Sequence, residues 1–68
     1  MISKRKIENS LSKQGYMIFN FSDGRECYIS REEDGTYLVD IEGREDEHTP
    51  SFDEAYKIIR MYDIPYRP

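Results

Sequence analysis

The sequence has few of the residue types from which catalytic and metal sites are built. Its 68 residues include one cysteine, one histidine and no tryptophan. The single cysteine, Cys27, cannot form a disulfide within the chain, and we expect a buried thiol in a cytoplasmic protein. Because His48 is the only histidine, a zinc site would lack its usual histidine and cysteine ligands.

Long apolar runs and clustered glycines are also absent. No run is long enough to span a membrane, and no apolar signal segment follows Met1. The four glycines are isolated, so neither glycine-rich phosphate-binding pattern occurs. With His48 expected in a loop and Cys27 in the interior, no nucleophile is expected to meet a base. We therefore expect a non-enzymatic protein without a cofactor, a metal or a small-molecule substrate.

Acidic residues outnumber basic ones by 14 to 10, and the net charge is −4. The charge is unevenly distributed along the chain. Residues 1–14 and 55–68 are both net positive, whereas residues 15–54 carry twelve acids against three arginines. This acidic middle segment disfavours nucleic acid as a partner.

Two Asp-Gly pairs, Asp23-Gly24 and Asp34-Gly35, are the strongest structural signal in the chain. Each lies between strand-like segments, and glycine accepts the positive φ that a tight hairpin turn requires. Turns of three residues predict one register that gathers the apolar side chains on a single face, and a one-residue slip would reverse a strand's whole apolar set. The predicted pairs are Phe21–Arg25, Phe19–Cys27, Met17–Ile29, Glu32–Thr36, Ile29–Val39 and Cys27–Ile41.

Helical patterns flank the predicted sheet on both sides. Ile7 and Leu11 are spaced i, i+4, which predicts a first helix, and Ser51 with Glu54 forms a capping box that opens a second. The predicted elements are a helix over residues 3–14, strands over residues 16–21, 25–31 and 36–42, a loop over residues 43–50, a helix from Ser51, and an extended tail at Ile64–Pro68.

The expected architecture is one small α+β domain that comprises residues 1–68. Its order is α-β-β-β-α, with a three-stranded antiparallel meander as one layer and both helices packed on the apolar face of the sheet as the other. The inward face would contain Met17, Phe19, Phe21, Cys27, Ile29, Val39 and Ile41.

The other face of this sheet has no predicted cover. It would carry aromatic and aliphatic side chains at its centre and carboxylates at its margin. Apolar centres that contain tyrosine and have polar margins are typical of protein interfaces. We therefore expect a protein-interaction module, with a homodimer as one form of the association. The candidate contact residues are Tyr16, Ile18, Tyr28 and Leu38.

The acidic residues support an alternative hypothesis. Under it, the protein is a nucleic-acid mimic that occupies the basic surface of a DNA- or RNA-binding protein. Small acidic inhibitors encoded by mobile elements are similar in size and charge. The candidate acidic surface comprises Glu26, Asp40, Glu42, Glu45, Asp46 and Glu47.

Direct nucleic-acid binding is a third hypothesis. The order of helix, three strands and helix is similar to that of the double-stranded RNA-binding domain, whose second helix begins with lysines that meet phosphates. In this chain the second helix begins Ser51-Phe52-Asp53-Glu54-Ala55, and its carboxylates would repel an RNA backbone. Binding would instead use N-terminal cations with stacking tyrosines. The residues concerned are Lys4, Arg5, Lys6, Lys13, Tyr16 and Tyr28.

Overall fold

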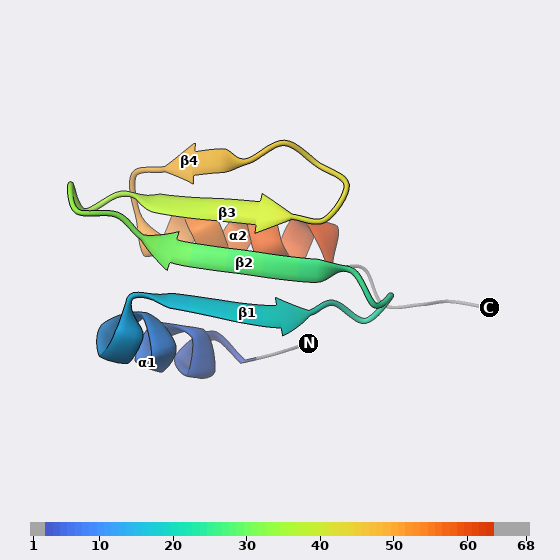
Figure 1. Ribbon diagram of the computed structural model, residues 1–68, viewed down its shortest axis with the longest axis horizontal. Helices are drawn as coiled ribbons and strands as arrows, with labels where there is room; N and C mark the ends of the chain where they lie inside the picture. The colour runs from blue at the N-terminus through green and yellow to red at the C-terminus, as the bar shows by residue number, and fades with distance from the viewer. Residues whose placement is uncertain (1–2, 64–68) are drawn as a thin grey trace.

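The structure is a computed structural model that describes residues 3–63 (Figure 1). Over these residues the chain forms two helices and a four-stranded antiparallel sheet in the strand order β1-β2-β3-β4, which is an α+β fold. The elements are α1 (Lys4–Gln14), β1 (Tyr16–Asn20), β2 (Glu26–Arg31), β3 (Tyr37–Ile41), β4 (Glu47–Thr49) and α2 (Phe52–Tyr62). The extended tail predicted for Ile64–Pro68 lies outside the described residues.

The two Asp-Gly turns set the register that the sequence predicts. β1 pairs with β2 so that Phe19 lies opposite Cys27, and β2 pairs with β3 so that Ile29 lies opposite Val39. The glycines of the two turns have φ values of 92° and 87°, in the left-handed region that favours glycine. The predicted pairing of the first three strands is therefore confirmed.

The aspartate of each turn binds the backbone that follows it. The N–H of Arg25 donates to Asp23 Oδ1, and the N–H of Thr36 donates to Asp34 Oδ1, each at 3.0 Å. The hydrogen bond from Arg25 lowers the pKa of Asp23, and those from the hydroxyl and N–H of Thr36 lower the pKa of Asp34. Ionisation of Asp23 and Asp34 therefore stabilises the two turns.

Replacing Gly35 with alanine is expected to lower the free energy of unfolding by about 1 kcal/mol. A Cβ at this position would meet no atom within 4 Å, so the cost arises from the backbone alone. In a domain of this size, such a loss lowers Tm by about 4–8 °C, which thermal unfolding followed by circular dichroism measures. Gly35→Asn is the control, because asparagine tolerates the left-handed conformation better than alanine. An equal or greater loss for asparagine would contradict this explanation.

The structure corrects the prediction of a three-stranded sheet. The segment after Gly43, predicted to be a loop, contains β4, whose three residues lie opposite Val39, Leu38 and Tyr37 of β3. The reason is the position at which α2 begins, since the ring of Phe52 lies 5.9 Å from that of Tyr37 at the start of β3. The chain leaving the end of β3 must return along that strand, and in doing so it pairs with the polar backbone groups of the β3 edge.

Both helices have a serine at the N-cap: the cap at Ser51 was predicted from the sequence, and the structure adds one at Ser3. Ser3 Oγ accepts a hydrogen bond from the N–H of Lys6, and Ser51 Oγ accepts one from the N–H of Glu54, both at 3.2 Å. The first helix ends at Gly15, whose φ is 85°. These local signals place α1 directly before β1 and α2 directly after β4.

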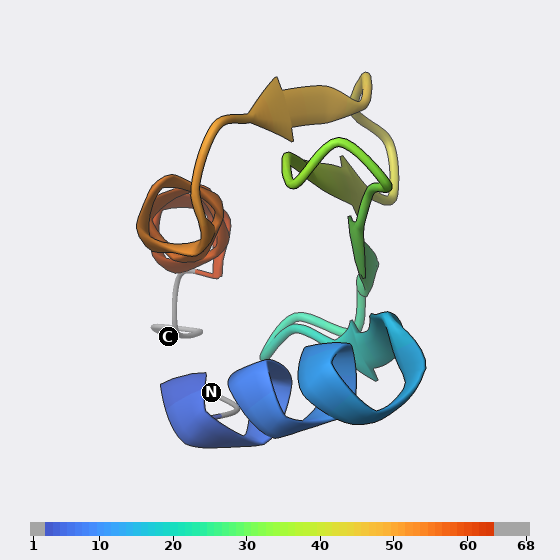
Figure 2. The same ribbon diagram turned by 90° about the vertical axis from the view of Figure 1, so that its left-hand side faces the viewer.

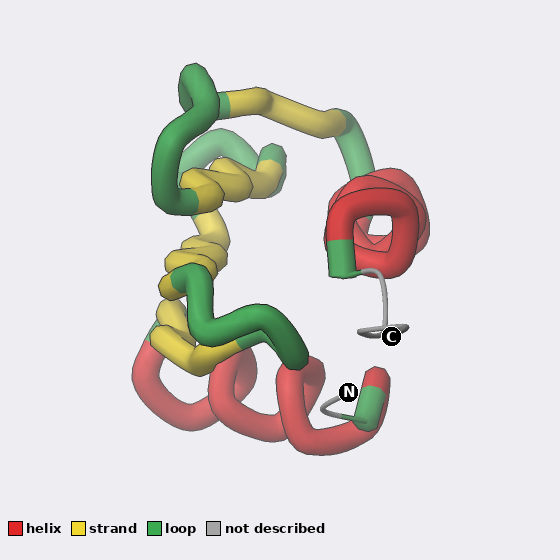
Figure 3. Tube along the Cα trace, turned by 90° about the vertical axis from the view of Figure 1, so that its right-hand side faces the viewer, coloured by secondary structure: helices red, strands yellow, loops and turns green. Residues whose placement is uncertain are grey.

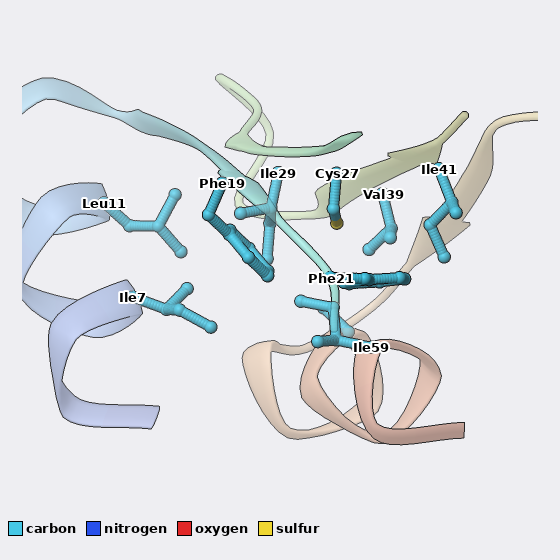
Figure 4. Packing of buried hydrophobic residues seen from close by; sticks show 10 residues of the cluster. Ile7, Leu11, Phe19, Phe21, Cys27, Ile29, Val39, Ile41 and Ile59 are labelled. Atoms are coloured by element: carbon cyan, nitrogen blue, oxygen red, sulfur yellow. The ribbon is translucent and has the colours of Figure 1, made fainter. Parts of the chain in front are cut away.

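One apolar cluster fills the space between the sheet and the helices (Figure 4). Ile7 and Leu11 of α1 approach it from one side and Ile59 of α2 from below the sheet in this view. Among the seven predicted inward residues, six are buried and Met17 packs partly buried against them. The buried apolar residues are Ile7, Leu11, Phe19, Phe21, Cys27, Ile29, Val39, Ile41, Ala55 and Ile59.

The first turn is also tied to the end of α2. A guanidinium N–H of Arg25 donates to the carbonyl of Tyr62 at 2.6 Å, and the N–H of Ser22 donates to Asp63 Oδ1 at 2.9 Å. These contacts join segments that are far apart in the sequence. They hold one end of the helix against the β1–β2 hairpin.

Candidate protein-interaction surface

The face of the sheet opposite the core, which we call the outer face, is not covered by either helix. Figures 2 and 3 show α2 over the core face and α1 beneath β1. The strand register arranges the outer side chains in rows that run across the sheet. The rows are Tyr16, Ser30, Leu38 and His48; then Ile18, Tyr28 and Asp40; then Asn20 and Glu26.

Two tyrosines and an isoleucine form the centre of the outer face. The rings of Tyr16 and Tyr28 are stacked, with centroids 6.1 Å apart and planes inclined by 27°. Ile18 lies opposite Tyr28 and is 52 % exposed, while Tyr16 is 42 % exposed. Leu38 and Tyr28 are half-buried. The structure therefore brings the four predicted contact residues onto one face, with Tyr16 and Leu38 in one row and Ile18 and Tyr28 in the next.

The fourth strand extends this face by one residue that the sequence did not assign to it. His48 is exposed and lies opposite Leu38. Between Leu38 and Tyr16 in the same row lies Ser30, which is buried and donates from Oγ to Glu32 Oε1 at 3.0 Å. The one feature of the sequence that could have indicated a strand at His48 is the neighbouring Thr49, because threonine favours strands. Thr49 is buried in the structure.

Carboxylates lie beside the tyrosines toward one end of the outer face. Asp40 is directly opposite Tyr28, and Glu26 is the next outer residue along β2. Glu42 Oε1 accepts the N–H of Glu26 at 2.9 Å, which places Glu42 beside it. All three acids are exposed, and none belongs to the ion pairs formed within residues 3–63. They leave a negatively charged margin next to an aromatic centre.

The six acids predicted to form one surface are divided by the structure. Glu45 and Asp46 are exposed in the connection between β3 and β4. Glu47 is half-buried and lies opposite Val39, a core residue, so its side chain projects on the core side of the sheet. The other three lie on or beside the outer face.

The N-terminal cations are not brought together with the tyrosines of the outer face. Lys4 Nζ lies 3.0 Å from Asp53 Oδ1 of α2, and 5.6 Å from the ring centroid of Tyr56. The hydrogen bond that Lys4 donates to the Asp53 carboxylate raises the pKa of Lys4. Since α2 lies over the core face, this pairing holds Lys4 away from Tyr16 and Tyr28. The arrangement gives no support to a combined cation and stacking site.

The single cysteine belongs to the core. Burial raises the pKa of the Cys27 thiol to about 12, with smaller effects from the carboxylates of Asp40 and Asp63. In the part of the chain that the structure describes, no three histidine, cysteine or acidic side chains are grouped as metal ligands. Nor does either described helix have the length and apolar character needed to cross a membrane.

Comparison with protein-family models, curated proteins and solved structures found no match to this chain. The geometry itself defines a small α+β domain with a four-stranded sheet, one face of which forms the core. The opposite face presents exposed aromatic and aliphatic side chains beside carboxylates that form no ion pair with any other residue of 3–63.

Proposed function

We propose that this protein is a small non-enzymatic interaction module that binds another protein through its outer face. The observation that supports this most directly is the exposed centre of that face, where Ile18 and Tyr16 retain 52 % and 42 % of their accessible area. In a fold with so small a core, apolar side chains left on the surface as a group indicate a contact site. The stacked pair of Tyr16 and Tyr28 supplies a rigid aromatic platform of the kind enriched at interface centres.

Burial of this centre would provide a driving force for association. Covering an isoleucine side chain completely is worth about 1.5–3 kcal/mol relative to full exposure, and Ile18 is half exposed. Tyrosine adds a large contact area with little loss of rotamer freedom. The outer face is also built on regular strands, so its side chains are held in place before a partner arrives.

Replacing Tyr28 and Leu38 together with alanine is expected to abolish association while the fold persists. Both side chains lie on the outer face and are only half-buried, so the core loses little. Sedimentation velocity and partner capture measure association, and circular dichroism measures the fold. Met61→Ala is the matched control, because Met61 is 62 % exposed but lies on α2. Association unchanged in the double variant would exclude the outer face as the contact site.

An acidic decoy is a second candidate, favoured by the three exposed carboxylates beside the aromatic centre, which pair with no cation in the described part of the chain. Under this function, the carboxylates would imitate phosphates and the tyrosines would contribute little. Binding would then weaken steeply with added salt and would survive the Tyr28→Ala, Leu38→Ala change. The same double variant therefore discriminates between the two candidates.

A further inference from the structure

We infer that the partner of the outer face presents arginine side chains, whose guanidinium planes stack on Tyr16 and Tyr28 and pair with Asp40 and its neighbouring carboxylates. The inference rests on the proposed function and adds the chemistry of the partner. It excludes a second copy of this chain as the occupant of the face. The inference is supported by the negative charge at both ends of the face, by the geometry of the two tyrosine rings, and by the contacts that arginines of this chain make with other aromatic rings.

The first observation is that both ends of the outer face carry negative charge. Glu26 and Asp40 lie at one end, and Glu32, which accepts a hydrogen bond from the outer residue Ser30, lies at the other. Two copies packed face to face would bring carboxylates against carboxylates whichever way the strands ran. Like charges in an interface cost several kcal/mol, so the face favours a cationic partner over itself.

The second observation is the geometry of the rings. The rings of Tyr16 and Tyr28 stack on each other, with centroids 6.1 Å apart and planes inclined by 27°, and Tyr16 keeps 42 % of its area exposed. A planar guanidinium stacks on an exposed ring and still directs a fixed fork of N–H groups sideways, whereas a lysine ammonium can lie over a ring, as Lys4 does over Tyr56, but is a point charge without that fork. Asp40 lies opposite Tyr28 in the register, in position to accept those N–H groups.

The third observation is that the chain already contains this combination. The guanidinium of Arg25 lies over the ring of Phe21, 5.3 Å from its centroid, while its Nε donates to Asp23 Oδ2 at 2.7 Å. Arg44 lies 4.0 Å from the ring centroid of Tyr62 and donates to the hydroxyl of that tyrosine at 2.7 Å. On the outer face, ring and carboxylate are both present, and no cation of residues 3–63 forms an ion pair there.

The test uses the full-length, isotope-labelled protein and a synthetic peptide in which arginine alternates with leucine. Nuclear magnetic resonance titration should show shifts at Ile18, Tyr28 and Asp40, with none centred on α2. A matched peptide with lysine in place of arginine should bind about threefold to tenfold more weakly. The variant Asp40→Asn, Glu42→Gln should bind the arginine peptide about fivefold more weakly at low salt. Glu54→Gln, an exposed acid on α2, is the control and should change nothing.

The outcomes separate this inference from the function on which it rests. Arginine-selective binding that is lost in the outer-face variants supports both. Equal binding of the two peptides, or binding unaffected by Asp40→Asn, Glu42→Gln, would overturn the role of arginine. If neither peptide shifts the outer face but the protein forms a dimer that Tyr28→Ala, Leu38→Ala abolishes, the inference fails and the interaction module stands. If no peptide binds and no association depends on Tyr28 and Leu38, both fail.

Discussion

Replacing Ile29 with alanine is expected to leave much of the protein unfolded at 37 °C. Ile29 is fully buried at the centre of the sheet, between Met17 of β1 and Val39 of β3. Truncation of a buried isoleucine costs about 2–5 kcal/mol, because the surrounding side chains only partly fill the cavity. A chain of 68 residues has a total stability of about 3–10 kcal/mol, so one such loss consumes much of it. Urea denaturation followed by circular dichroism measures the change.

Ile18→Ala is the matched control for this loss. Ile18 has the same side chain, lies on the adjacent strand and is 52 % exposed on the outer face. Its truncation is expected to cost less than about 1 kcal/mol, because no closed cavity is formed. If the two variants lost equal stability, the assignment of core and outer face would be wrong.

The stability of the protein is expected to fall as the pH rises above about 9, in part because of Cys27. The folded-state pKa of this thiol is raised to about 12 from an ordinary value of 9.0. Between those values the unfolded thiol loses its proton while the folded thiol retains it. The unfolded state then binds fewer protons, so the free energy of unfolding decreases with pH, by at most about 1.4 kcal/mol per unit from this group. Well below pH 9 the thiol is protonated in both states and contributes no slope.

Comparison with Cys27→Ala isolates the thiol from the tyrosines and lysines, which also titrate at alkaline pH. The variant loses some stability at every pH, but the decline with pH in urea denaturation should be shallower. The folded wild type should also react with a thiol reagent at pH 8 far more slowly than the unfolded chain, because almost no thiolate is present. Parallel pH profiles for the two proteins would show that Cys27 does not carry the effect.

The pairing of the first three strands was predictable because its causes are local. Each Asp-Gly pair fixes a turn through the φ of its glycine and a hydrogen bond to its aspartate. Once the turns are fixed, the alternation of side chains assigns each strand residue to the core face or the outer face. The grouping of Tyr16, Ile18, Tyr28 and Leu38 follows from this register, so the centre of the candidate surface was also accessible from the sequence.

The fourth strand was not predictable, because its cause is distant in the sequence. Glu47, His48 and Thr49 form too short a segment to give a periodic signal, and acidic residues precede them. They become a strand because α2 packs beside the start of β3, where the ring of Phe52 meets that of Tyr37. The chain must therefore return along β3.

The sequence by itself determined the register of three strands, the cap of the second helix and the division between core and outer face. Turn chemistry, capping and side-chain alternation act over a few residues, so they can be followed along the chain. Only the tertiary structure decided that His48 lies on the outer face and that Glu47 lies on the core side of the sheet. It also decided that Lys4 pairs with Asp53 of α2. These outcomes depend on which segments lie side by side after the core has formed, and packing of the whole chain sets that arrangement.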